Sequence, residues 1–468
     1  MLTIRKGVRG KMKRSSQRPN VLFIMADQHR FDYLGSAGAS FLRTPNLDRL
    51  AALGTRFTHC VTNCPVCAPA RIGLATGLQP TRLGSLDNAS YLPHSVPTHY
   101  QRFRDHGYRV GCVGKLDLAK PSGYNGRYGD RPCVYTWGFT HPKECEGKMH
   151  AGSSPVPIGP YTHYLEDRGL LQAFYQDYQV RKAQGWTTKA AHDSVLPTDA
   201  FEDCYIGQRA AEWIRNIPDD FPWYHFVSFV GPHDPYDPPA AYAEHYRDTE
   251  MPPSVRDELE GKPRWVGARQ VEATDREIAV TRQQYCGSIE AIDDQVGAIL
   301  DALEARGMLE NTYIVFTSDH GEMLGDHGLY AKSAAYEASL RIPLILAGPD
   351  IAPGHTSDAL VELIDLNPTL CELVGIPVQE NLDARSLTPV LLDKQAAHRE
   401  DVVSAIRHWR CIRTQSHKLI QNYNDETELY DLQQDPNELH NVAAQQPDLV
   451  RELASRLGSR FKEGQWLR

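Results

Sequence analysis

The chain has 468 residues, of which 41% are hydrophobic and 23% charged, a composition typical of globular proteins. Acidic residues outnumber basic ones by 59 to 50, a formal net charge of −9, which argues against a nucleic-acid-binding surface over the whole chain. No apolar segment reaches the roughly 18 residues that a membrane-spanning helix needs, so the sequence does not predict an integral membrane protein.

Residues 1–18 are rich in Lys and Arg and are expected to form a disordered basic tail. A basic arm that binds an anionic surface is the alternative. Because no apolar segment follows the basic residues, the sequence does not predict a secretory signal peptide. The ten cysteines are sparsely spread. We therefore expect a cytoplasmic protein with reduced thiols.

Short apolar segments alternate with amphipathic ones between residues 19 and 392. The alternation predicts an α/β domain with a mostly parallel central sheet flanked by helices. Helices are expected over residues 45–53, 69–78 and 285–306, and strands over residues 21–25, 108–114, 223–230, 312–316 and 342–346.

Two regions have a different sequence pattern. Residues 393–468 contain short strand candidates and an amphipathic segment at 447–461, which predicts a small C-terminal α+β domain. Residues 120–196 have little periodicity, and we expect an insertion that shapes the substrate site. Its aromatic and basic residues would stack on a sugar and meet its anionic groups, although packing within a long loop is the alternative. They are Tyr124, Tyr128, Tyr135, Trp137, Phe139, Tyr161 and Tyr164, with Arg127, Arg131, His141 and Lys143.

The segment from Cys67 to Arg71 reads Cys-Ala-Pro-Ala-Arg and lies at the expected start of a helix. Free N–H groups at such a position favour anions, and Arg71 would add a fixed cation one turn later. Cys64 and Cys67 also have the spacing of a redox pair or half a zinc site. The chain is much longer than a thioredoxin-like module, however, and no second cysteine pair follows at suitable spacing.

Polar residues follow four of the expected strands, namely Asp27, Lys115, His233 and Asp319. Open α/β sheets place their ligand sites at the carboxyl ends of strands, so we expect these residues to lie at one site.

Neighbouring residues extend this set. The pairs Asp27-Gln28 and Asp319-His320 suit a hard divalent cation, and the imidazole moves the preference toward manganese. Lys332 adds a second ammonium group to that of Lys115. The resulting cationic pocket would bind a sulfate or phosphate group during in-line displacement.

Taken in order, these segments resemble the formylglycine-dependent sulfatases of the alkaline phosphatase superfamily over nearly the whole chain. The resemblance rests on residues 19–28, 67–77, 114–115, 232–235, 317–328 with Lys332, and 428–436. It implies that a formylglycine-generating enzyme oxidises Cys67 to formylglycine. One hydroxyl of the hydrated aldehyde would attack sulfur, and the second would lose its proton to release sulfate.

The same resemblance implies a role for each matched residue. The divalent metal, with calcium favoured over manganese, would be held by Asp27, Gln28, Asp319, His320 and the residue at position 67. Arg71 would brace the formylglycine, Lys115 and Lys332 would contact the sulfate oxygens, and His233 would be the general acid at the leaving oxygen. Asn88 would make a further polar contact to the anion.

One position departs from the family pattern. Many sulfatases have Gly-Lys-x-His where this chain has Gly114-Lys115-Leu116-Asp117. Asp117 is a candidate base for the second step, although its charge would repel an anion. We expect hydrolysis of an organic sulfate monoester, with a sulfated saccharide as substrate. A phosphonate monoester or phosphodiester hydrolase and a non-catalytic anion-binding relative remain alternatives, and assembly into a homo-oligomer is left open.

Overall fold

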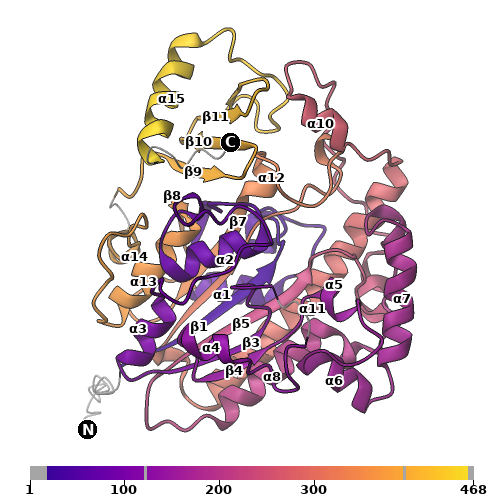
Figure 1. Cartoon of the computed structure of the whole chain (residues 1–468), viewed down its shortest axis with the longest axis vertical. Helices are drawn as coiled ribbons and strands as arrows, with labels where there is room; N and C mark the ends of the chain where they lie inside the picture. Colours follow the sequence, from indigo (N-terminus) through magenta and orange to yellow (C-terminus); the bar gives the residue numbers. More distant parts are fainter. Residues whose placement is uncertain (1–17, 121–123, 394–396, 462–468) are drawn as a thin grey trace, which may run out of the picture.

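The computed structural model describes residues 18–120, 124–393 and 397–461. It consists of a large α/β domain and a smaller domain near the C-terminus (Figure 1). The tail predicted for residues 1–18 lies outside the described residues, except for Arg18. All ten cysteines are free thiols in this structure. In the described ranges, no helix is long and apolar enough to cross a membrane.

An eight-stranded sheet forms the centre of the large domain, in the order β4-β3-β5-β1-β6-β7-β2-β8. Only β7 runs antiparallel to its neighbours β6 and β2. The mostly parallel sheet predicted from the sequence is therefore confirmed. The strands are β1 (Asn20–Asp27), β2 (Gly54–Val61), β3 (Arg109–Gly114), β4 (His141–Glu144), β5 (Trp223–Pro232), β6 (Thr312–Ser318), β7 (Arg341–Ala347) and β8 (His355–Glu362).

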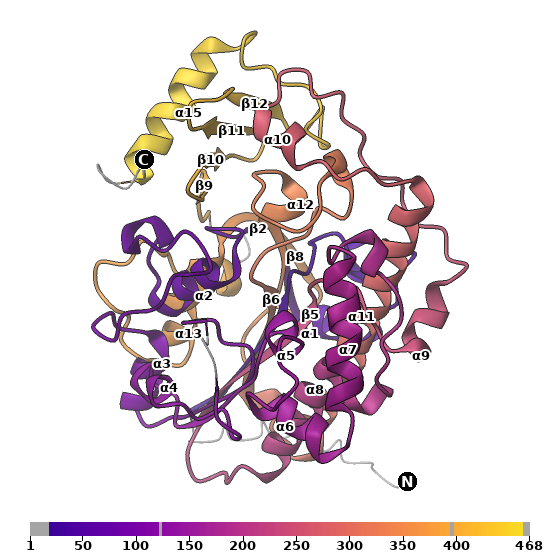
Figure 2. The same cartoon turned by 45° about the vertical axis from the view of Figure 1, so that its right-hand side comes forward.

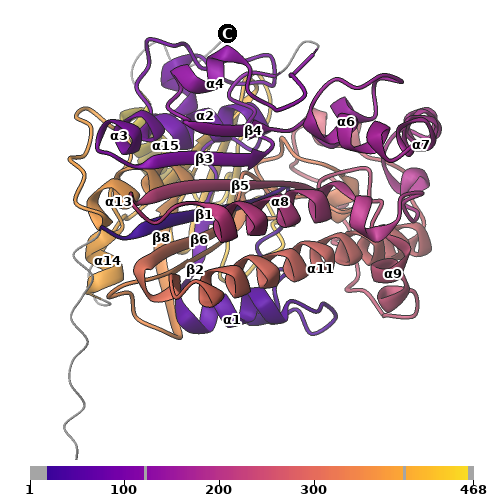
Figure 3. The same ribbon diagram turned by 90° about the horizontal axis from the view of Figure 1, so that it is seen from below.

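Helices cover both faces of this sheet because successive side chains of its strands point to opposite sides. In β1, Val21, Phe23 and Met25 join one apolar core, while Leu22, Ile24 and Ala26 join the second. The first face is covered by α2 (Cys67–Thr76), α3 (His99–Asp105) and α13 (Leu366–Leu373). The second is covered by α1 (Pro45–Leu53), α8 (Glu202–Asn216) and α11 (Asp275–Ala305), as Figure 3 shows.

The described part of residues 120–196 contains several short helices and one strand. They contain α4 (Pro132–Thr136), the edge strand β4, α5 (Lys148–Ala151), α6 (Pro160–Asp167) and α7 (Leu171–Ala183). The expected sugar platform is wrong for Trp137, Phe139 and Tyr161, which are buried in the two cores. These rings fill the space that the added helices must cover, and of the seven aromatic residues only Tyr124, Tyr128 and Tyr135 are exposed.

The small domain is an antiparallel sheet with one long helix, as the sequence predicts (Figure 2). Its strands are β9 (Val402–Ala405), β10 (Trp409–Arg413), β11 (His417–Asn422) and β12 (Glu428–Asp431), and α15 (Pro447–Arg460) packs on one face. The other face packs on residues of segment 323–340 of the large domain. This contact fixes the segment that carries Lys332. The remaining helices are α9 (Ala240–Ala243), α10 (Arg264–Arg269), α12 (Glu337–Leu340) and α14 (Thr388–Leu392).

Candidate active site

Four strands bring polar side chains to one edge of the central sheet. Asp27 ends β1, while Lys115, His233 and Asp319 directly follow β3, β5 and β6. These strands are adjacent and parallel in the order β3-β5-β1-β6, so their carboxyl ends meet. The structure thus brings together the residues that the sequence places after strands.

Gly114 makes the approach of Lys115 to this edge possible. Its φ is +98°, and a Cβ atom there would lie 1.9 Å from the carbonyl oxygen of Ser228. The next N–H, that of Lys115, donates a hydrogen bond to the same oxygen (3.1 Å). Only glycine allows β3 to lie this close to β5 and the chain to turn into the site.

Cys67 is the first residue of α2 and is almost fully buried. Its Sγ lies 3.2 Å from Nε2 of His320 and 3.9 Å from Oδ1 of Asp27. Burial and Asp27 raise the pKa of the thiol, but the ammonium groups of Lys115 and Lys332 outweigh them and hold that pKa well below its ordinary value. The position therefore favours an anionic group on residue 67.

The donor atoms of Asp27, Cys67, Asp319 and His320 fit a single metal ion. One ligand atom from each lies within 4.8 Å of all the others, and all four residues are buried. Nε2 of His320 is 3.9 Å from Oδ1 of Asp27 and 3.7 Å from Oδ1 of Asp319. Ligands about 2.0–2.6 Å from a shared ion have such separations. The set can therefore hold a divalent cation.

Arg71 binds the two carboxylates of this set. Its Nη2 donates to Oδ2 of Asp27 (2.9 Å) and its Nε to Oδ2 of Asp319 (2.8 Å). Its Nη1 donates to the carbonyl of Lys115 (2.7 Å) and to Oγ of Ser228 (2.8 Å). The sequence places this cation beside residue 67, but the structure commits the guanidinium to the metal carboxylates. Arg71 is thus a positioning residue.

Gln28 lies between the metal donors and the second lysine. Its Oε1 accepts a hydrogen bond from Nζ of Lys332 (2.7 Å), and its Nε2 donates to Oδ1 of Asp234 (3.1 Å) and to Glu322. The amide oxygen is therefore used by Lys332, and the role of Gln28 as a metal ligand stays a prediction. Nζ of Lys332 is also 2.5 Å from Nε2 of His233.

A cavity of about 210 Å³ opens beside Cys67. Five predicted residues line it, namely Cys67, Asn88, Lys115, Asp117 and His233. Its lining also includes Lys120, Lys148, Met149 and His150. Segment 120–196 therefore reaches the site through α5. No described member of the predicted aromatic platform lines this cavity.

Sequence reasoning missed two kinds of functional residue. Asp234 and Glu322, which hold the Gln28 amide, lie inside matched segments, so their carboxylates beside His233 and His320 were an available signal. The α5 residues carry no such signal, because their approach to the cavity depends on tertiary packing.

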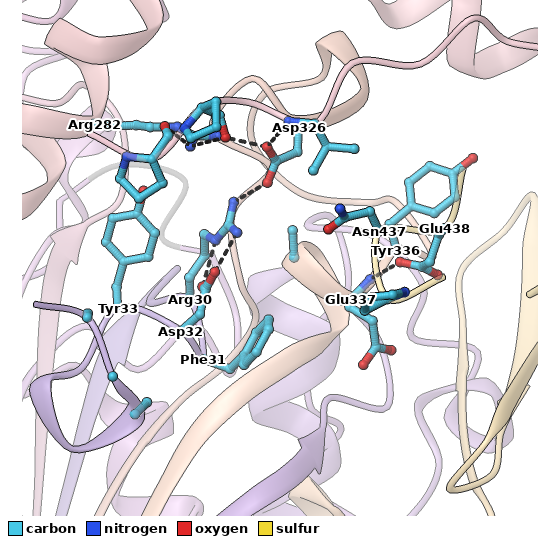
Figure 4. Close-up of a pocket in the computed structure, with 18 of the residues that line it drawn as sticks. Arg30, Phe31, Asp32, Tyr33, Arg282, Asp326, Tyr336, Glu337, Asn437 and Glu438 are labelled. Atoms are coloured by element: carbon cyan, nitrogen blue, oxygen red, sulfur yellow. Dashed lines mark hydrogen bonds and ion pairs between the residues drawn. The ribbon is translucent and has the colours of Figure 1, made fainter. Parts of the chain in front are cut away.

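A second cavity, of about 370 Å³, is lined by the chain that follows the metal donors (Figure 4). Nη1 of Arg30 donates to Oδ2 of Asp326 (2.7 Å), and Nη2 of Arg282 donates to Oδ1 of the same carboxylate (2.7 Å). Arg30 also forms an ion pair with Asp32. Since Arg30 follows β1 and Asp326 follows β6, the pair ties together the two segments that carry the metal donors.

Comparisons with known proteins agree with this geometry. The sulfatase family model matches residues 19–376, and the model of the N-sulphoglucosamine sulphohydrolase C-terminal region matches residues 325–464. A choline-sulfatase of Rhizobium meliloti (strain 1021) is 30% identical over 454 residues, which cover 91% of this chain and 82% of that protein. An N-acetylglucosamine-6-O-sulfatase of Bacteroides thetaiotaomicron is 28% identical over 485 residues, or 92% and 83%.

Among solved structures, the phosphonate monoester hydrolase of Agrobacterium radiobacter superposes with a TM-score of 0.81 at 25% identity, over 95% of each chain. The family model covers most of the chain, and the strands, the metal donors and the small C-terminal domain are consistent with it. The chain therefore belongs to the sulfatase family of the alkaline phosphatase superfamily and is a sulfuric ester hydrolase.

Proposed function

We propose that this enzyme hydrolyses sulfate monoesters of saccharides, using formylglycine made from Cys67 by a formylglycine-generating enzyme and calcium as the metal. The observation that carries the proposal is the place of Cys67: it begins α2, shares a metal-sized cluster with Asp27, Asp319 and His320, and faces a cavity lined by cationic groups. Formylglycine, once formed, supplies an oxygen nucleophile that no ordinary side chain provides.

The lysines hold the negative charge of the ester group. Nζ of Lys115 lies 2.5 Å from Oδ2 of Asp27, and Nζ of Lys332 lies beside His233. Burial lowers the pKa of both lysines, but neighbouring anionic groups outweigh it, and both pKa values are raised. Both groups therefore stay charged and can stabilise the charge that develops on the sulfate oxygens.

His233 is placed to give a proton to the leaving oxygen. Its Nδ1 is 2.6 Å from the carbonyl oxygen of Asp234, which orients the ring, and its Nε2 is 2.5 Å from Nζ of Lys332. We propose that Nε2 gives up the proton and that the Lys332 ammonium group shares that contact. Asn88 accepts from the N–H of Ala68 through Oδ1 (3.1 Å), so its amide nitrogen is left to donate to the anion. These are the roles that we propose for the two residues.

The proposed substrate class rests on the relatives and on the size of the cavity. One relative is an N-acetylglucosamine-6-O-sulfatase. The volume of about 210 Å³ is below the roughly 300–1,000 Å³ of typical small-ligand pockets, which favours an ester on a single sugar unit. We propose that α5 contacts that sugar through Met149 and His150.

Two measurements test this function. A peptide mass measurement across Cys67, on protein from its native host, should show an aldehyde in place of the thiol. Modified enzyme should hydrolyse para-nitrophenyl sulfate, and Cys67→Ala should abolish that activity. Full activity with an intact thiol would contradict the proposal. Fractionation of the same host would test the cytoplasmic location predicted from the sequence.

Phosphonate monoester hydrolysis is the second candidate, with manganese as the expected metal. It is favoured by the superposition on the Agrobacterium radiobacter enzyme and by Asp117, where many sulfatases have histidine. Turnover of a phosphonate monoester and of para-nitrophenyl sulfate by the same preparation decides between them. A higher kcat/KM on the phosphonate would overturn the assignment to sulfate esters.

A further inference from the structure

Asp117 is a buried carboxylate in a cavity that must bind an anion. Its side chain is only 5% exposed, and Oδ2 lies 3.2 Å from Nζ of Lys115. It also forms an ion pair with Lys120, whose side chain is 35% exposed. Its backbone φ of +53° is uncommon for a residue with a side chain. This conformation turns the carboxylate toward the lysines.

The contacts of Asp117 do not suit a catalytic base. Burial raises the pKa of Asp117, but the ammonium groups of Lys115 and Lys120 outweigh it and lower that pKa. A carboxylate held by two cations is a poor proton acceptor. The candidate role as base for the second step therefore has little support, and the side chain must affect the site in another way.

The effect that remains is on the charge of the cavity. Lys115 lines the cavity and provides a fixed positive charge for the incoming anion, and Lys332 adds a second positive charge beside His233, outside that lining. Asp117 sets one negative charge against Lys115 in the same lining. Lys120 offsets that charge incompletely, because solvent screens a side chain that is one-third exposed. A ligand with one negative charge is still attracted, whereas a second negative charge on the ligand is repelled by the carboxylate of Asp117.

We propose that Asp117 makes the site selective for tetrahedral esters with a single negative charge and against doubly charged phosphate monoesters. The inference rests on the proposed hydrolytic function and adds a specificity-determining residue to it. Sulfate monoesters, phosphonate monoesters and phosphodiesters all belong to the accepted class. The selectivity is by charge, so it holds whether the central atom is sulfur or phosphorus.

The test compares three para-nitrophenyl esters at a pH of about 8, where a phosphate monoester, with a second pKa near 6, carries two charges. They are the sulfate, the phosphate monoester and a methyl phosphodiester. Asp117→Asn should raise the phosphate-to-sulfate ratio of kcat/KM by about 10- to 100-fold, for charges a few ångströms apart at an effective dielectric constant of roughly 20–80. The diester-to-sulfate ratio should stay constant.

Lys120→Gln is the matched variant, because it removes the partner and leaves the carboxylate. It should lower the phosphate-to-sulfate ratio, the opposite of Asp117→Asn. If both variants reduced all three activities in proportion, Asp117 would have only a structural role and the inference would be overturned.

Binding separates this inference from the proposed function. In a Cys67→Ala background, calorimetry should show the same opposite shifts in the ratio of Kd for phosphate monoester and sulfate ester. Lack of turnover of every ester by the modified enzyme would refute the proposed function, while the Kd ratios would still decide the role of Asp117.

Discussion

Replacing Arg71 with methionine tests whether this guanidinium and the metal ion neutralise the same pair of carboxylates. Arg71 is 1% exposed and donates to Asp27, Asp319, the carbonyl of Lys115 and Ser228. Methionine fills much of the volume and removes the charge. Without metal, the negative charges of Asp27 and Asp319 would then be neutralised by fewer positive charges. We expect the free energy of unfolding to fall by about 3–5 kcal/mol, as for other broken buried ion pairs.

Calcium should reduce this loss. The ion carries charge to the same two carboxylates, so the remaining cost comes from the lost bonds to the Lys115 carbonyl and the Ser228 hydroxyl, about 1–3 kcal/mol in total. Urea unfolding followed by circular dichroism, once with calcium and once with a chelator, gives the two values. The destabilisation by Arg71→Met should be roughly 2 kcal/mol smaller with calcium present.

Arg181→Met is the matched control. Arg181 is also fully buried and binds Asp177 and the carbonyls of Ala190 and His192, but none of its partners belongs to the metal cluster. Its destabilisation should be the same with and without calcium. An Arg71→Met loss that calcium leaves unchanged would refute the shared neutralisation.

Three further changes test the surroundings of the site. Asp326→Asn should lower the free energy of unfolding by about 3 kcal/mol, because it leaves Arg30 and Arg282 without their shared buried carboxylate. Calorimetry should also show weaker calcium binding. Unchanged binding would mean that the contact of Asp326 with the two arginines does not position the metal donors. Asp203 is buried and its pKa is raised to about 6 from 3.8. The folded protein therefore binds this proton more tightly than the unfolded chain, and the free energy of unfolding should fall as the pH rises from about 4 to 6. Asp203→Asn should make this fall, measured by urea unfolding, smaller by about 3 kcal/mol. An identical pH profile would contradict the burial argument. Unmodified Cys67 offers sulfur, so unmodified protein should bind cobalt or zinc with thiolate coordination, seen as a sulfur-to-cobalt absorption band that Cys67→Ser removes; a band that persists would place the metal elsewhere.

Much of the fold could be predicted from local patterns. The apolar run from Val21 to Met25 is long enough for a buried strand but too short for a helix, and it lies in β1. Pro45 and Gly54 predict the start and end of a helix, which the structure places at Pro45–Leu53. Segment 120–196 could not be read in this way, because its helices are short and its aromatic rings are distributed between two cores. Burial of Trp137 and Phe139 depends on the packing of that segment against the sheet, which no local periodicity reveals.

The candidate site was predictable where strand ends determine it. Asp27, Lys115, His233 and Asp319 needed only the rule for the carboxyl edge of a parallel sheet. The partners of Arg71 were not predictable, since a guanidinium with several donors can bind a ligand or the carboxylates that hold the metal. The choice depends on distances of 2.8 and 2.9 Å across three chain segments. The approach of α5 to the cavity was not predictable either, because it also depends on tertiary packing.

The pairing of charges in the site also predicts how metal and anion binding are coupled. Lys115 is bound to Oδ2 of Asp27 and to Asp117, and Arg71 shares that same oxygen of Asp27. Asp27 cannot give its full charge to a metal ion and to Lys115 at once. Donation from Asp27 to a divalent cation therefore weakens its hold on the ammonium group and leaves Lys115 free to bind an ester oxygen. Since coupling between two ligands is reciprocal, a bound sulfate ester should raise calcium affinity by the factor by which calcium raises the affinity for the ester, and Lys115→Met should abolish most of that factor.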